Sequence, residues 1–177
     1  MARIKYADIA RAQDSELVNR IVEQRGKVLH LYRMLLHSPV LTNGWLNFLT
    51  PIRQQTELNG LLRELAIIRI AVLNRAQYEA EQHRPYALKE GATEAQLDAL
   101  ANWEKSALFT DEQKAVLAYV DAMTRSVEVS DDIFSQVRKC FSDKVLIELT
   151  ATIAAYNMVS RFLVAMKINS ADDFDAG

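Results

Sequence analysis

The fold is decided by the stretch LRELAIIRIA, residues 62–71. Its apolar side chains would fall on nearly every side of a helix, which is typical of a helix buried on most of its faces. We predict this helix over residues 61–73, with a break near Asn74. A second helix is expected over residues 76–90, because the glycine that follows is common at helix C-termini.

Capping patterns predict further helices along the rest of the chain. Thr93–Gln96 and Thr110–Gln113 each begin with a threonine and end with a glutamine, which is the pattern of a capping box. Ser130 is suited to cap a helix that ends near Phe141, and a last long helix is expected over residues 142–166. No segment alternates between apolar and polar residues at a period of two, so we predict no sheet.

The sequence therefore predicts an all-α protein, a compact bundle of about eight helices. The chain is long enough to bury a substantial core, and no stretch of it has the composition of a linker. We expect one domain over residues 1–177, with a lead-in arm at residues 1–12 and a loose tail at residues 169–177.

The composition excludes several classes of partner. The chain has 21 basic and 23 acidic residues and a formal net charge of −2, so nothing draws it toward nucleic acid or a membrane surface. Residues 1–8 lack the apolar run of a signal peptide, and no stretch approaches the roughly 18 uncharged apolar residues of a membrane span. We expect a cytoplasmic protein. Cys140 is the sole cysteine, which excludes dithiol chemistry within one chain.

Several ionisable residues lie on the helices predicted over residues 61–73 and 76–90. Glu79 and His83 are four residues apart, so their side chains can touch on one helical face. A carboxylate beside an imidazole favours the imidazolium and fixes the orientation of the ring. If the break at Asn74 folds the two helices into a hairpin, Glu64 could approach His83 from the neighbouring helix. Tyr78 would add a phenolic hydroxyl to this candidate site.

Structural explanations of the same residues stay open. Glu79 and His83 could form an ordinary surface pair, and Glu64 could be paired with Arg63 or Arg69 at a helix end. The spacing of Glu79 and His83 would also suit two metal ligands, but a catalytic metal site usually has a third. The remaining histidines lie in the apolar N-terminal part of the chain, so we expect no metal.

The last helix offers a second polar pair. Asn157 and Arg161 are four residues apart and could share a face. The guanidinium of Arg161 could bind a substrate carboxylate, since its geometry matches that group. Alternatively, Arg161 neutralises Glu148 or another carboxylate of the core.

Several of these residues resemble a known family. Leu62–Arg69, then Tyr78, Glu79 and His83, and then Ala87 and Gly91 resemble the carboxymuconolactone decarboxylase family, to whose fold the alkylhydroperoxidase AhpD also belongs. The resemblance covers most of the chain and implies an AhpD-like helical fold. It also implies a homo-oligomer, a trimer, hexamer or dimer. The apolar N-terminal helices could supply the subunit contact through Leu31, Leu35, Leu36, Trp45 and Phe48.

The peroxidase branch of this family uses a glutamate, a Cys-x-x-Cys pair and a histidine. In the present sequence Glu64 matches the glutamate and His83 matches the histidine, but the cysteine positions fall on Ala76 and Glu79. A thiolate is the nucleophile of that chemistry, and neither alanine nor glutamate can replace it. The sequence therefore disfavours an AhpD-like peroxidase activity of the peroxiredoxin type.

The decarboxylase branch needs acid and base groups rather than thiols. The resemblance to it implies a cofactor-free lyase or isomerase that acts on a small carboxylate or lactone. His83 would be the general acid or base, Glu79 would orient it and Glu64 would be a second proton relay. Tyr78 could donate a hydrogen bond to a developing enolate. A non-enzymatic helical oligomer that binds a small ligand is the remaining alternative.

Overall fold

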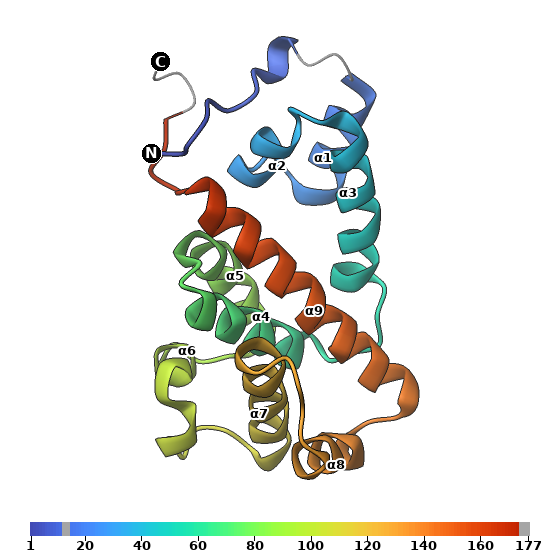
Figure 1. The fold of residues 1–177 in the computed structure, drawn as a ribbon, viewed down its shortest axis with the longest axis vertical. Helices are drawn as coiled ribbons and strands as arrows, with labels where there is room; N and C mark the ends of the chain where they lie inside the picture. Colours follow the sequence, from blue (N-terminus) through green and yellow to red (C-terminus); the bar gives the residue numbers. More distant parts are fainter. Residues whose placement is uncertain (12–14, 174–177) are drawn as a thin grey trace. The chain divides into compact units, whose positions relative to one another are not determined.

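The computed structural model describes residues 1–11 and 15–173, and it is all-α, as predicted. Within those residues it has nine α-helices, two 3-10 helices and no strand, against the roughly eight helices expected. The elements are η1 (Ile9–Arg11), α1 (Ser15–Arg25), α2 (His30–Leu35), α3 (Pro39–Gln54), α4 (Gly60–Asn74), α5 (Gln77–Lys89), α6 (Glu94–Ala99), η2 (Leu100–Lys105), α7 (Asp111–Arg125), α8 (Asp131–Cys140) and α9 (Asp143–Met166) (Figure 1).

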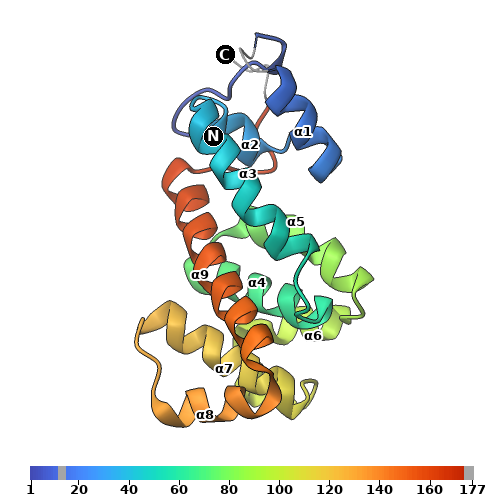
Figure 2. The ribbon, with the colours of Figure 1, turned by 90° about the vertical axis from the view of Figure 1, so that its right-hand side faces the viewer.

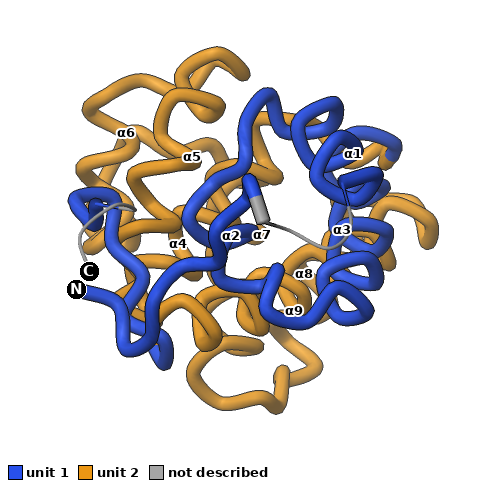
Figure 3. Tube along the Cα trace, turned by 90° about the horizontal axis from the view of Figure 1, so that it is seen from above, with its two compact units in different colours: residues 1–55, 165–177 blue, residues 56–164 orange. Residues whose placement is uncertain are grey.

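The chain divides into two compact units, which Figure 3 shows in different colours. The first comprises residues 1–55 and 165–177, and the second comprises residues 56–164. The one domain expected over residues 1–177 stays a prediction. Asp172, which lies in the predicted tail, accepts hydrogen bonds from the Ala2 amide at 3.2 Å and the Tyr6 hydroxyl at 2.7 Å. Residue 12 of the predicted arm and residues 174–177 of the predicted tail lie outside the described residues.

The helices predicted over residues 61–73 and 76–90 form as α4 and α5 and lie next to each other in the second unit. The break near Asn74 is confirmed, because Arg75 has a left-handed backbone with φ of 58° that ends α4. Gly91 has φ of 101° just after α5, a backbone conformation that glycine adopts without steric cost. α4 packs against both α5 and α7 (Figures 1 and 2).

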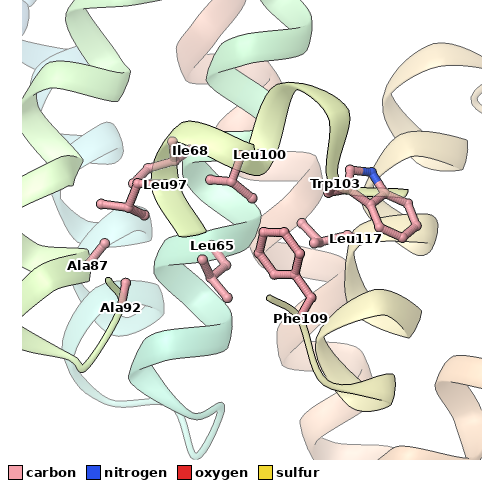
Figure 4. Packing of buried hydrophobic residues seen from close by; sticks show 9 residues of the cluster. All are labelled: Leu65, Ile68, Ala87, Ala92, Leu97, Leu100, Trp103, Phe109 and Leu117. Atoms are coloured by element: carbon pink, nitrogen blue, oxygen red, sulfur yellow. The ribbon is translucent and has the colours of Figure 1, made fainter. Parts of the chain in front are cut away.

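Apolar side chains from α4, α5, α6, η2, α7 and two of the loops between them form a core in this unit (Figure 4). Its buried members are Leu65, Ile68, Ala87, Ala92, Leu97, Leu100, Trp103, Phe109 and Leu117. Both predicted capping boxes are present, since the Thr93 and Thr110 side chains accept from the amides of Gln96 and Gln113. These caps fix where α6 and α7 begin, and the apolar faces of both helices then complete the core around α4.

A buried ion pair ties α4 to α7. Arg69 is 1 % exposed, and its Nε and one terminal nitrogen each donate to Asp121 at 2.6 Å. Its other terminal nitrogen donates to the carbonyls of Leu100 at 2.7 Å and Ala101 at 3.1 Å. The alternative that Arg69 pairs with Glu64 is therefore wrong, because every nitrogen of this guanidinium is directed to α7 and η2.

The exposed apolar residues of the first unit differ from those expected at a subunit contact. Leu31, Leu35 and Leu36 are buried within the chain itself, because α2 turns its apolar face inward. Phe48 is 49 % exposed, and within the helices of this unit Val40 at 84 % and Leu41 at 65 % are more exposed, both in the first turn of α3.

α9 is the one helix of the described residues that is long and apolar enough to cross a membrane. Half of the apolar stretch of α9 is buried inside the protein. The core helix of a protein that crosses no membrane passes the same test, so this is weak evidence of a span. A cytoplasmic location stays a prediction. Cys140, the last residue of α8, is exposed.

Candidate active site

The hairpin of α4 and α5 brings a carboxylate and an imidazole together. The Oε2 atom of Glu64 lies 2.7 Å from Nδ1 of His83, and the two residues are 3 % and 5 % exposed. Glu64 also has a cationic neighbour, because Nε of Arg63 donates to its Oε1 at 3.2 Å. This geometry confirms the expected approach of Glu64 to His83 and shows that the pair is buried rather than on the surface.

Glu79 has a different environment. It is 2 % exposed, and its Oε2 accepts a hydrogen bond from the hydroxyl of Ser160 on α9. Its Oε1 is buried and has no hydrogen-bond partner among the described residues. Burial raises the pKa of Glu79 to about 8, although the Ser160 hydroxyl partly opposes the shift. At neutral pH the Glu79 side chain is therefore mainly a neutral carboxylic acid.

The expected pairing of Glu79 with His83 is wrong. His83 contacts Glu64 of α4, whereas Oε2 of Glu79 accepts a hydrogen bond from Ser160 of α9. Spacing along a helix allows a contact between residues four apart, but the elements packed around the helix decide which contact forms.

α9 contributes two residues that the sequence analysis did not assign to the site. The ring of Tyr156 lies edge-on to the His83 ring, with centroids 5.1 Å apart and planes at 88°. Ser160 follows one helical turn later and is fully buried. Residues four apart on a helix share a face, so this spacing on an apolar helix was the signal that could have found them.

The remaining candidates lie on the same helices. Tyr78 is buried in the first turn of α5, next to Glu79 in sequence. Asn157 is buried, but its polar atoms bond elsewhere: its Oδ1 accepts from Asn74 at 2.9 Å and Arg161 at 3.1 Å, and its amide donates to Thr124 at 3.0 Å. No described contact joins this network to Glu64 or His83.

Arg161 itself is exposed. No ion pair between Arg161 and Glu148 is found among the described residues, and Oε2 of Glu148 accepts from the backbone amides of Glu57 at 2.8 Å and Leu58 at 3.0 Å. The alternative that Arg161 neutralises another carboxylate stays a prediction. Arg161 and Asn157 are on one face of α9, as their spacing predicted, but a substrate carboxylate at Arg161 stays a hypothesis.

No group of three histidine, cysteine or acidic side chains that could hold a metal ion is found in residues 1–11 and 15–173. His83 contacts the carboxyl group of Glu64, and Glu79, four residues away on the same helix, is a second carboxyl whose pKa is raised by burial.

This fold and this pair of residues define an AhpD-like helical protein that lacks the pair of thiols. Residues 39–122 match the model of the carboxymuconolactone decarboxylase family. This match agrees with the family resemblance that the sequence predicts.

One curated relative and two solved structures illustrate the likeness. The uncharacterized protein YdfG of Bacillus subtilis strain 168 is 28 % identical over 115 residues, which cover 64 % of this chain and 78 % of YdfG.

An uncharacterized peroxidase-related protein from Ralstonia eutropha JMP134, described as an alkylhydroperoxidase AhpD core, has a TM-score of 0.83 and 18 % identity, covering 98 % of this chain and 94 % of that one. The debrominase Bmp8, in complex with 2,3,4-tribromopyrrole, has a TM-score of 0.80 and 16 % identity, covering 96 % of this chain and 91 % of that one. At these identities the two structures show the fold alone.

Proposed function

We propose that this protein is a cofactor-free enzyme of acid–base chemistry, a lyase or isomerase that acts on a small carboxylate or lactone, with His83 as its general acid or base. The observation that supports the proposal is the buried contact of 2.7 Å between Glu64 and His83. Buried ionisable groups destabilise a fold unless they are paired, and their presence in one place is typical of a functional site.

Glu64 prepares His83 for proton transfer in two ways. Its carboxylate accepts the Nδ1 proton, which leaves Nε2 as the basic atom of the ring. When Nε2 takes a proton from a substrate, the same carboxylate stabilises the imidazolium that forms. Arg63 favours the ionised state of Glu64, because its guanidinium lies against the other carboxylate oxygen.

A peroxide-reducing activity has less support. Ala76 and Glu79 provide no thiol at the positions where the peroxidase branch has its cysteines. Cys140 is the remaining candidate, but burial and the charge of Glu112 raise the pKa of its thiol. A raised pKa lowers the fraction of the nucleophilic thiolate at neutral pH.

The proposal is tested first by finding a ligand and then by removing the base. A thermal-shift screen with small lactones, muconate-like acids and β-keto acids identifies compounds that stabilise the folded protein. With a compound that is turned over, His83→Ala should lower the rate by roughly 10²–10⁴-fold, the range for a general acid or base.

His37→Ala is the matched control, because His37 is exposed and bonds a backbone carbonyl in the N-terminal unit. It should leave the rate unchanged, and circular dichroism should show both variants folded. An unaltered rate in folded His83→Ala would reject His83 as the catalyst and would favour a non-enzymatic protein that binds a small ligand.

A further inference from the structure

The two buried glutamates of the site have opposite surroundings. Glu64 contacts the guanidinium of Arg63 at 3.2 Å and the imidazole of His83 at 2.7 Å. Glu79 has one hydroxyl partner, Ser160, and no charged side chain contributes to the shift of its pKa. Surroundings of this kind favour a charged carboxylate at Glu64 and a protonated carboxyl at Glu79.

The face of α9 that contacts Glu79 also contacts the imidazole. Tyr156 packs against the His83 ring, and Ser160, one turn further along α9, donates to Glu79. Glu79 and His83 are likewise one turn apart on α5. The earlier residue of α5, Glu79, contacts the later residue of α9, Ser160, and the later residue, His83, contacts the earlier one, Tyr156. The two side chains therefore face the same stripe of α9, with the acid and the base on one side of α5.

A purely structural role for Glu79 is disfavoured by its unsatisfied oxygen. Oε1 is buried and has no hydrogen-bond partner in the described part of the chain. A buried polar atom without a partner destabilises the folded state, and an apolar side chain of similar size would avoid this. Oε1 of Glu79 thus keeps a hydrogen-bonding position that no described residue fills.

We infer that Glu79 is the catalytic acid of this site, a neutral carboxylic acid that works together with the base His83, and that the substrates are enolisable carbonyl compounds. The inference rests on the proposed function and adds to it the second proton-transferring group and the substrate class. Glu79 also occupies the position to which the family resemblance assigns a thiol, so a group that carries a proton is retained there while sulfur is absent.

The reaction step is balanced by two protons. Nε2 of His83 removes a proton from the carbon next to the carbonyl group, and the electron pair of that C–H bond becomes a carbon–carbon double bond. The carbonyl π-electrons move to oxygen, which takes the proton of Glu79. The products are an enol, an imidazolium stabilised by Glu64 and a Glu79 carboxylate. Return of the protons, to the same carbon or to another, completes an exchange or an isomerisation without an oxidant or reductant.

The raised pKa of Glu79 fits this role. A pKa of about 8 keeps the carboxyl protonated at neutral pH and still allows it to give up its proton during a reaction. An ordinary glutamate would be ionised at this pH and would have no proton to donate.

The experiment follows deuterium incorporation from D2O into pyruvate and α-angelica lactone, an open-chain and a cyclic enolisable carbonyl compound, by proton NMR. His83→Ala and Glu79→Gln should each slow the exchange by roughly 10²–10⁴-fold. Glu81→Gln is the matched control, because Glu81 is an exposed glutamate of the same helix, and it should leave the exchange rate unchanged.

The pH profile separates a proton donor from a structural residue. The exchange rate of the unaltered protein should fall as the pH rises through about 8, and Glu79→Gln should lack this decline. Infrared difference spectra should show a protonated carboxyl band at neutral pH that is missing from Glu79→Gln. Absence of that band in the unaltered protein would overturn the inference, whatever the activity.

The outcomes distinguish the inference from the proposed function. Exchange that depends on His83 but keeps its rate and pH profile in Glu79→Gln would overturn the role of Glu79 and leave the proposed function standing. Exchange of both probes no faster than in buffer, or equally fast in His83→Ala, would overturn the proposed function and the inference with it.

Discussion

Glu64 and Glu79 show how the same side chain acquires two different environments within one helical hairpin. Each is at most 3 % exposed, so burial acts on both. The difference lies in their partners, which are an arginine and a histidine for Glu64 and a serine for Glu79. Cationic partners favour the ionised carboxylate, whereas burial without them favours the protonated form. An acid and a base can therefore coexist at one pH.

Replacing Glu79 should change the pH dependence of stability. The pKa of Glu79 is raised from 4.5 to about 8 in the folded state, so the folded protein holds this proton more tightly than the unfolded chain does. The stability that Glu79 contributes is present below about pH 4.5 and is lost as the pH rises towards about 8. Glu79→Gln does not titrate, so its free energy of unfolding should fall less steeply over this range, by up to about 1.4 kcal/mol per pH unit.

Urea unfolding at several pH values within this range measures the effect. Glu81→Gln again serves as the control and should follow the unaltered protein. Parallel curves for Glu79→Gln and the unaltered protein would show that Glu79 is ionised in the folded state.

The sequence pointed to the residues of the candidate site more clearly than to their hydrogen-bond partners. Glu64, Glu79 and His83 stood out because ionisable groups are rare on apolar helices. The choice of Glu64 over Glu79 as the partner of His83 could not be predicted, because it depends on Ser160 and Tyr156 of α9. Those residues are far away in sequence, and local spacing carries no information about which helix will pack there.

At the scale of the elements, α4 is held by both apolar burial and charge. Its apolar residues were read correctly from the sequence, and the predicted range of 61–73 differs little from Gly60–Asn74. The ion-pair partner of Arg69 could not be predicted, because Asp121 lies 52 residues further along the chain. A guanidinium that is 1 % exposed must have several partners, and α7 and η2 provide them.

Arg69→Met should destabilise the protein strongly. The substitution leaves Asp121, whose side chain is 14 % exposed, without its closest cation, and removing one member of a buried pair typically costs about 3–5 kcal/mol. Arg84→Met is the control, because Arg84 forms an exposed ion pair with Asp98 at 2.9 Å and should cost at most about 1 kcal/mol. Denaturant unfolding of both variants gives the comparison, and equal losses would contradict the structural importance of the Arg69 pair.

At the scale of the whole molecule, the helical class could be predicted because helix periodicity and capping are local features. The likeness to the family was recognised from particular residues that resemble its motif. The division into two units was not predicted, since residues 165–177 join residues 1–55 across more than 100 intervening positions. Subunit contacts were equally hard to predict. Leu31, Leu35 and Leu36 looked available in the sequence, but their own chain buries them.

We expect the protein to be a homo-oligomer, as the family resemblance implies, with the exposed start of α3 as part of the contact. Val40 and Leu41 expose large apolar areas in adjacent positions, and such surface is often covered by a second subunit. Light scattering at micromolar concentration should give a mass above the 20.1 kDa of one chain. The double substitution Val40→Asp and Leu41→Asp should lower that mass.

Val127→Asp is the matched control, since Val127 is 82 % exposed in the loop between α7 and α8, and it should leave the mass unchanged. A mass of one chain for the unaltered protein would exclude the oligomer at this concentration.

The exposed thiol of Cys140 offers a physical probe that needs no mutation. Because it is the sole cysteine and lies at the end of α8, a nitroxide reagent would place one unpaired electron on each chain. Dipolar coupling between such electrons then arises only between separate copies. Pulsed electron paramagnetic resonance on the labelled protein would thus measure the distance between the α8 helices of different copies in any assembly that forms. A flat dipolar trace would mean that the labels lie in separate particles or beyond the range of the method.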